Sequence, residues 1–89
     1  IMAKRITTAE ATKMAQFFLS KKYAGTISDF RVHTEAGGSR AIATCKVDCK
    51  MWNQHFKVEV VMDAVYNTIE AREYRHEDNL SFYRNPELQ

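Results

Sequence analysis

Two stretches of alternating apolar and polar residues, 41–49 and 56–62, form the clearest pattern in the chain. Such alternation is typical of strands that bury one face. In an antiparallel register that places Lys46 opposite Glu59, apolar residues meet on one face and opposite charges meet on the other. Each charge pair across a ladder contributes roughly 0.2–1 kcal/mol. The pattern therefore predicts a hairpin of two strands, with its turn at Trp52-Asn53.

Two further stretches with period two, 26–34 and 68–76, flank this hairpin. Gly37 and Gly38 favour a tight turn directly after the 26–34 stretch. Each stretch aligns with its neighbour in a register that pairs opposite charges. Across the four strands we expect one exposed row of charges that alternate in sign: Asp29, Lys46, Glu59 and Arg72.

A helix is predicted before the strands. Thr7 and Glu10 have the spacing of a capping box, and the helix should run to about Tyr23. Gly25 is expected to end it as a left-handed residue. One apolar stripe follows from the helical spacing of Ala11, Met14, Ala15, Phe18 and Leu19. The small residues Ala41, Ala43 and Cys45 should leave space for the large members of this stripe.

The expected fold is α+β, with one N-terminal amphipathic helix packed on a four-stranded antiparallel meander. It should form a single domain over residues 1–77, followed by a tail over 78–89. A different fold, α-β-β-β-α, would result if residues 64–77 formed a helix with Asp63 as its N-cap. The first layout resembles the cystatin or PepSY class in the order of its elements. The chain lacks the Gln-x-Val-x-Gly loop of cystatins, so no residue role is carried over.

Composition and charge indicate what kind of protein this is and where it should be found. The 89 residues are 45% hydrophobic and 27% charged, with a net charge of +2, which is the balance of an ordinary globular protein. No apolar run approaches the ~20 residues that span a bilayer, and residues 2–5 do not resemble a secretory signal. We therefore expect a cytoplasmic protein with no membrane partner.

The sequence offers little catalytic or metal-binding chemistry. Cys45 and Cys49 lie four residues apart on one predicted strand, about 13 Å, which is too far for a disulfide. We expect two buried free thiols, with His33 and His55 on the opposite face of the sheet. No glycine-rich phosphate loop occurs. These features predict no metal, no cofactor, no catalytic residues and a protein that is not an enzyme.

Protein recognition has the best support in the sequence. Trp52 and Met51 are expected at an exposed hairpin tip, and tryptophan is a favoured anchor of interfaces. In the tail, three large apolar residues should dock on the same or a second subunit: Leu80, Phe82 and Tyr83. We therefore expect a small binding module or inhibitor with an unidentified protein partner. It should form a homodimer through one of the edge strands.

Two other functions remain open at this point. Nucleic acid could bind a basic helix face formed by Lys4, Arg5, Lys21 and Lys22, although the sheet's basic residues alternate with acidic ones. A small enzyme could use a pocket between the helix and the sheet.

Overall fold

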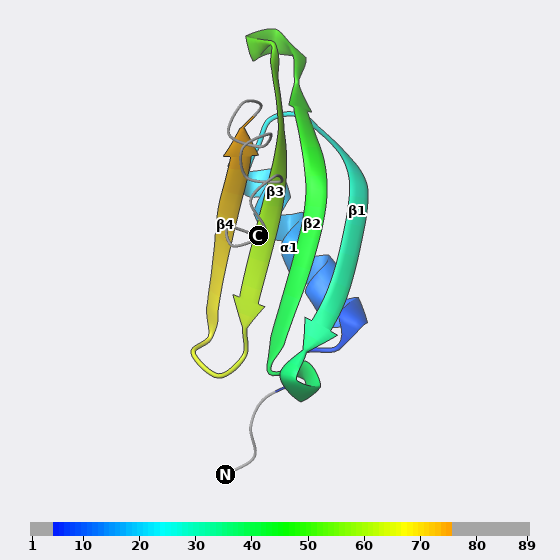
Figure 1. The fold of residues 1–89 in the computed structure, drawn as a ribbon, viewed down its shortest axis with the longest axis vertical. Coiled ribbons are helices and arrows are strands. Elements are labelled where there is room, and N and C mark those ends of the chain that lie inside the picture. The colour runs from blue at the N-terminus through cyan, green and yellow to red at the C-terminus, as the bar shows by residue number, and fades with distance from the viewer. Residues whose placement is uncertain (1–4, 76–89) are drawn as a thin grey trace, which may run out of the picture.

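The computed structural model describes residues 5–75 as one helix on a four-stranded antiparallel sheet of order β1-β2-β3-β4 (Figure 1). The elements are α1 (Thr8–Lys22), β1 (Thr26–Glu35), β2 (Arg40–Cys49), β3 (Gln54–Asp63) and β4 (Thr68–Arg75). Short 3₁₀ turns, Ala36–Gly38 and Lys50–Trp52, join β1 to β2 and β2 to β3. The α+β prediction is confirmed. The alternative helix over 64–77 is wrong, because β4 pairs with β3 along its whole length.

Both ends of α1 are set by local chemistry, one as expected and one not. The capping box is present: the Glu10 amide donates to Thr7 Oγ1 (3.1 Å), and the Thr7 amide donates to Glu10 Oε1 (2.9 Å). At the other end, Tyr23 leaves the helix in extended backbone, with φ −123°. Gly25 is therefore not the left-handed residue that the sequence suggested, and positive φ among the glycines is found at Gly37 and Gly38.

Gly25 is needed for space instead. A Cβ atom at this position would lie 2.7 Å from the Asp48 carbonyl oxygen and 2.8 Å from Cys49 Sγ. The segment between α1 and β1 thus passes directly against the end of β2. Only a residue without a side chain permits this approach.

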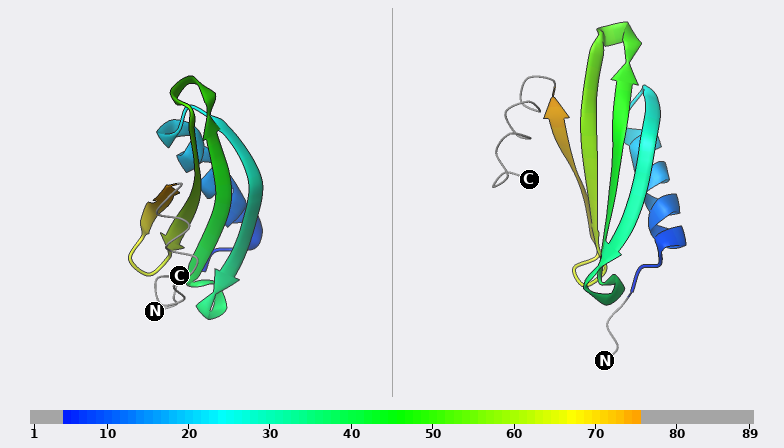
Figure 2. Two further views of the ribbon diagram at one scale, coloured as in Figure 1. Left: turned by 45° about the horizontal axis from the view of Figure 1, so that its top comes forward. Right: turned by 45° about the vertical axis from the view of Figure 1, so that its right-hand side comes forward.

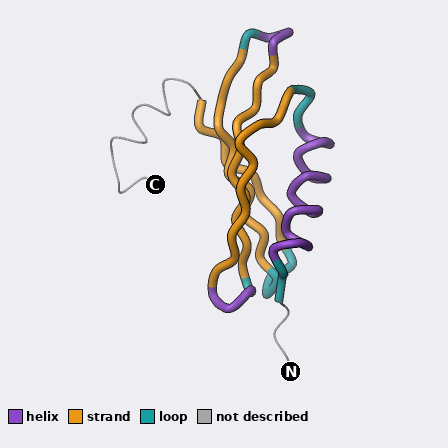
Figure 3. Tube along the Cα trace, turned by 90° about the vertical axis from the view of Figure 1, so that its right-hand side faces the viewer, coloured by secondary structure: helices purple, strands orange, loops and turns teal. Residues whose placement is uncertain are grey.

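The core lies between α1 and one face of the sheet. In Figure 1 the helix crosses behind the sheet from β1 at its N-terminus towards β3 at its C-terminus, and Figures 2 and 3 show it as a separate layer. From α1 the buried residues are Ala11, Ala15 and Leu19. From the sheet they are Ala41, Ala43, Cys45, Val47, Cys49, Phe56, Val58, Val60 and Met62. Met14, expected in the stripe, is instead 43% exposed.

Two of the three predicted registers are confirmed in whole or in part. Between β3 and β4, Arg72 lies opposite Glu59 as expected. Between β1 and β2 the expected register holds from Arg31 to Glu35 and then shifts at a bulge after Ser28. Asp29 lies within this bulge at φ 52°, a left-handed conformation that aspartate tolerates better than most residues.

The predicted register between β2 and β3 is wrong by two residues. Lys46 lies opposite Lys57, and Glu59 lies opposite Thr44. A shift of two keeps every side chain on its face, so the alternation cannot distinguish the two registers. The short turn decides between them, because it places Cys49 opposite Gln54. The expected row of four charges therefore splits into two pairs, Lys46–Asp29 (3.2 Å) and Arg72–Glu59 (3.6 Å).

Replacing Gly25 by alanine should destabilise the fold by about 1–3 kcal/mol, the usual cost of overpacking, because the added Cβ would overlap Asp48 and Cys49. Chemical denaturation measures this change. Gly37→Asn is the control: unlike Gly25, Gly37 has a positive φ, which asparagine tolerates, and nothing lies within 4 Å of its Cβ position. Equal stability of Gly25→Ala and the parent chain would contradict this account of the crossing.

Candidate functional site

The hairpin of β2 and β3 extends beyond both flanking strands (Figures 1 and 2). The β1 pairing begins at Thr26, opposite Asp48, and the β4 pairing ends at Arg75, opposite Phe56. Residues 50–53 close this projection and are called the hairpin tip here. The tip therefore extends past the ends of β1 and β4.

The hairpin tip presents two large apolar side chains to solvent. Met51 is 86% exposed and Trp52 is 67% exposed. The turn itself is ordered by a hydrogen bond from the Asn53 amide to the Lys50 carbonyl (3.0 Å). Asn53 adopts the left-handed conformation, which asparagine tolerates better than most residues. The prediction that Met51 and Trp52 lie at an exposed turn is confirmed.

A group of five side chains holds the base of the hairpin, and we call it the brace: Tyr23, Gln54, Phe56, Glu73 and Arg75. The Arg75 guanidinium lies 3.7 Å from the centre of the Phe56 ring and donates to Gln54 Oε1 (3.1 Å). The Phe56 ring meets Tyr23 edge-on, with 5.4 Å between ring centres. The brace thus links the end of α1, the hairpin base and the end of β4.

The charge within the brace is balanced by direct bonds. The Tyr23 hydroxyl donates to Glu73 Oε2 (2.5 Å), while Arg75 Nη2 donates to Glu73 Oε1 (2.7 Å). The hydrogen bond from Tyr23, with Arg75 as a further cause, lowers the pKa of Glu73 below its ordinary value. Burial, with the bond to Glu73, raises the pKa of Tyr23. At neutral pH the brace therefore holds a carboxylate, a guanidinium and a neutral phenol.

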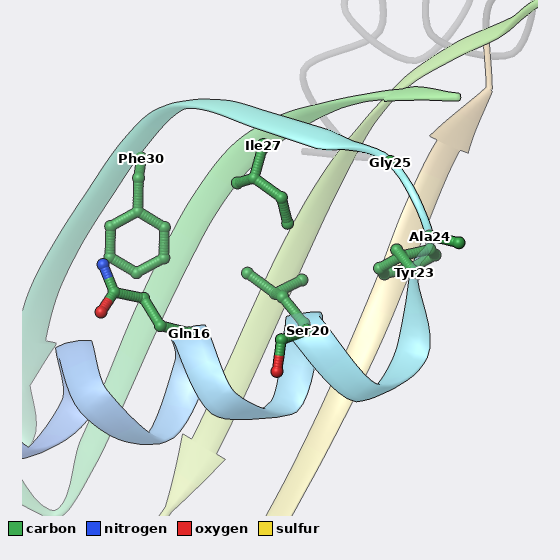
Figure 4. A pocket seen from close by; sticks show the side chains of 8 residues that line it. Gln16, Ser20, Tyr23, Ala24, Gly25, Ile27 and Phe30 are labelled. Carbon is green, nitrogen blue, oxygen red and sulfur yellow. The ribbon is translucent and has the colours of Figure 1, made fainter. Parts of the chain in front are cut away.

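An apolar hollow of about 440 Å³ lies beside the brace, between α1 and β1 (Figure 4). Figure 4 shows Ile27 and Phe30 pointing from β1 towards α1, with the Gln16 amide beside the Phe30 ring. The lining residues are Gln16, Leu19, Ser20, Tyr23, Ala24, Gly25, Ile27 and Phe30. Among the described residues that line it, none is a histidine, cysteine, aspartate, glutamate, lysine or arginine.

Of the four basic residues that the sequence placed on one helix face, three lie within the described part of the chain. Lys21 lies over the Phe17 ring at 5.4 Å, and Lys22 lies over the Tyr23 ring at 5.8 Å. Arg5 lies at the opposite end of α1, next to Gly38. Lys4 lies outside the described residues, as do the tail residues Leu80, Phe82 and Tyr83.

The thiols and imidazoles lie on opposite faces of the sheet. Cys45 and Cys49 are buried and free, and burial raises the pKa of the Cys45 thiol. His33 lies 3.2 Å from Glu35, and His55 lies 3.2 Å from Asp48. Within residues 5–75 no three histidine, cysteine or acidic side chains converge on a possible metal position. The described part of the chain also contains no helix long and apolar enough to cross a membrane.

The sequence suggested a pocket between the helix and the sheet, as part of the small-enzyme alternative, but not which residues line it, and it did not predict the brace. The alternation of faces along β4 could have indicated the brace, because Glu73 and Arg75 lie on the same inward face as Ile69 and Ala71. Two charged residues at inward positions of a strand indicate a polar cluster there. The hollow leaves no comparable signal in the sequence, because none of the described residues that line it is charged.

Glu73→Gln should lower the free energy of unfolding at neutral pH. This free energy should also change less as the pH falls than it does in the parent chain. The lowered pKa of Glu73 means that its contribution is present above the unfolded value, taken as 4.5, and is lost as pH falls through the folded value. Thermal unfolding of both proteins from about pH 6 down to about pH 3 measures the difference. Tyr23→Phe, which keeps the ring contact, should remove part of the same acid dependence. Parallel curves for Glu73→Gln and the parent chain would contradict the assigned role of Glu73.

Comparison with known proteins adds no functional assignment. No protein-family model, curated protein or solved structure matches the chain. The resemblance to the cystatin or PepSY class is not confirmed by any of these comparisons.

Proposed function

We propose that this protein is a small non-catalytic binding module or inhibitor that acts through protein contacts made chiefly by the hairpin tip. The observation that carries the proposal is the exposure of Trp52 and Met51 at the end of a projecting hairpin. Tryptophan is enriched among residues that dominate binding energy, and methionine adapts to irregular apolar surfaces. A protein partner with an apolar cleft fits this chemistry.

The support beneath the tip strengthens the proposal. The turn is closed by the bond between Asn53 and Lys50, and the brace joins the hairpin base to α1 and β4. A binding element held in its bound conformation loses less entropy when the complex forms. The tip therefore combines a large apolar contact with a small ordering cost.

The positions of the basic residues along the helix favour a protein over a nucleic acid as the partner. Arg5 and the pair Lys21 and Lys22 lie near opposite ends of α1, which is about 22 Å long for its 15 residues. They do not form one continuous patch, which phosphate binding would favour. Two free buried cysteines are in keeping with a reducing compartment, so the proposal places the protein in the cytoplasm.

Trp52→Ala should weaken partner binding at least about tenfold, because a tryptophan hot spot contributes about 2 kcal/mol or more. A photo-cross-linking amino acid at position 50, an exposed position in the same turn that leaves Trp52 in place, identifies the partner in an extract of the producing cell. Titration of the purified partner then measures the affinity. Since Trp52 is exposed, the substitution should leave the unfolding free energy nearly unchanged.

Tyr66 supplies the matched control. It is 78% exposed on the turn between β3 and β4, at the other end of the molecule, and its amide donates to Asp63 Oδ1 (3.0 Å). Cross-linking from position 66 should not yield the partner, and Tyr66→Ala should bind it normally. The proposal fails if Trp52→Ala binds the partner as tightly as the parent chain does.

A further inference from the structure

The sheet has two edges, β1 and β4, which differ in their suitability for pairing with another strand. In residues 5–75 no strand lies on the outer side of either one. An edge strand presents unpaired N–H and C=O groups, which form a template for a strand of another chain. The two edges can therefore be compared as docking surfaces.

The β1 edge is irregular. Its ladder with β2 shifts between Ser28 and Arg31, and Asp29 within the bulge has φ 52°. A bulge leaves a residue unpaired and increases the local twist, which blocks continuous pairing along an edge. This edge is poorly suited to a second strand.

The β4 edge is regular. Every residue from Thr68 to Arg75 pairs with β3 in a single register, which gives about 26 Å of continuous strand. In Figure 1 the lower part of β4 has no helix behind it, since α1 lies behind β1 to β3. Ile69 and Ala71, on the helix side of β4, are only partly buried.

The charges on β4 are self-complementary. On the face away from α1, Glu70 is exposed and has no ion-pair partner among the described residues, while Arg72 is also exposed. Two copies of β4 related by a two-fold axis pair antiparallel, with residues of the same face opposite each other. When Ala71 lies on the axis, Glu70 of each copy faces Arg72 of the other.

The neighbouring registers lack this complementarity. An axis through Glu70 would set two glutamates against each other, and an axis through Arg72 would set two arginines against each other. Like charges directly across a ladder are destabilising. The axis through Ala71 also places two small side chains together at the centre, so nothing bulky blocks the approach.

We propose that the occupant of the β4 edge is a second copy of this chain, paired two-fold about Ala71 into one continuous eight-stranded sheet. The two Glu70–Arg72 contacts fix the register, and each copy covers part of the other's exposed β4. This surface is separate from the hairpin tip, so the inference goes beyond the proposed function and leaves both tips free.

Analytical ultracentrifugation of the full 89-residue chain over a range of concentrations should show a monomer–dimer equilibrium. Glu70→Arg should raise the dimer Kd at least about tenfold, since it replaces two attractive contacts by two repulsive ones. Glu35→Arg is the matched control, because it makes the same change of charge on β1, and it should leave the Kd unchanged. Circular dichroism confirms that each variant is folded.

Complementation tests the register itself. Arg72→Glu alone should also weaken the dimer, but an equimolar mixture of Glu70→Arg and Arg72→Glu chains should form a mixed dimer with restored affinity. The Arg72→Glu chain loses the Arg72–Glu59 pair (3.6 Å) and gains a second carboxylate opposite Glu59, so circular dichroism has to show that it is folded before the two chains are mixed.

Cysteine cross-linking gives an independent readout. Ala71→Cys should yield a disulfide-linked dimer on mild oxidation, because opposed residues lie about 4.5–5.5 Å apart between Cα atoms. Ile69→Cys should not, since the two copies of that residue would be about 13 Å apart. A monomer at all concentrations overturns the proposal. So does a dimer that Glu70→Arg leaves intact, or one that links through position 69.

Discussion

The fold depends on the close packing of one helix against the small-residue side of the sheet. Ala11 and Ala15 of α1 are fully buried, as are Ala41 and Ala43 of β2, so the two layers approach closely. The segment after α1 then passes against the end of β2, where Gly25 leaves room for it. This approach brings the end of α1 beside the hairpin base, and the brace forms there. The support of the hairpin tip therefore follows from how the helix packs.

Much of this arrangement could be predicted from the sequence, because side-chain periodicity reports which face of an element is buried. The faces of β2 and β3, the capping box of Thr7 and Glu10, and the exposed turn at Trp52 all follow from local patterns. The register between β2 and β3 does not, since a shift of two residues leaves the same faces buried. It is set by the turn that ends at Asn53, whose conformation the strand pattern does not encode.

The remaining differences have one common cause: they arise where elements distant in sequence meet. Gly25 has the position of a helix-ending residue in the sequence, but its lack of a side chain serves a contact with β2 more than twenty residues later. Glu73 and Arg75 occupy inward positions because Tyr23 and Gln54, far away along the chain, provide hydrogen-bond partners for them. Long-range partners of this kind cannot be read from one strand alone.

We propose two separate interaction surfaces on one small domain, an apolar tip and a charge-matched strand edge. The central proposal is that Trp52, the single tryptophan of the chain, is exposed in the free protein and becomes buried by the partner. Acrylamide quenching of tryptophan fluorescence, with and without saturating partner, tests this most directly. The account predicts strong quenching of the free protein and protection in the complex. An indole that is shielded in the free protein, or equally quenched in both states, would contradict it.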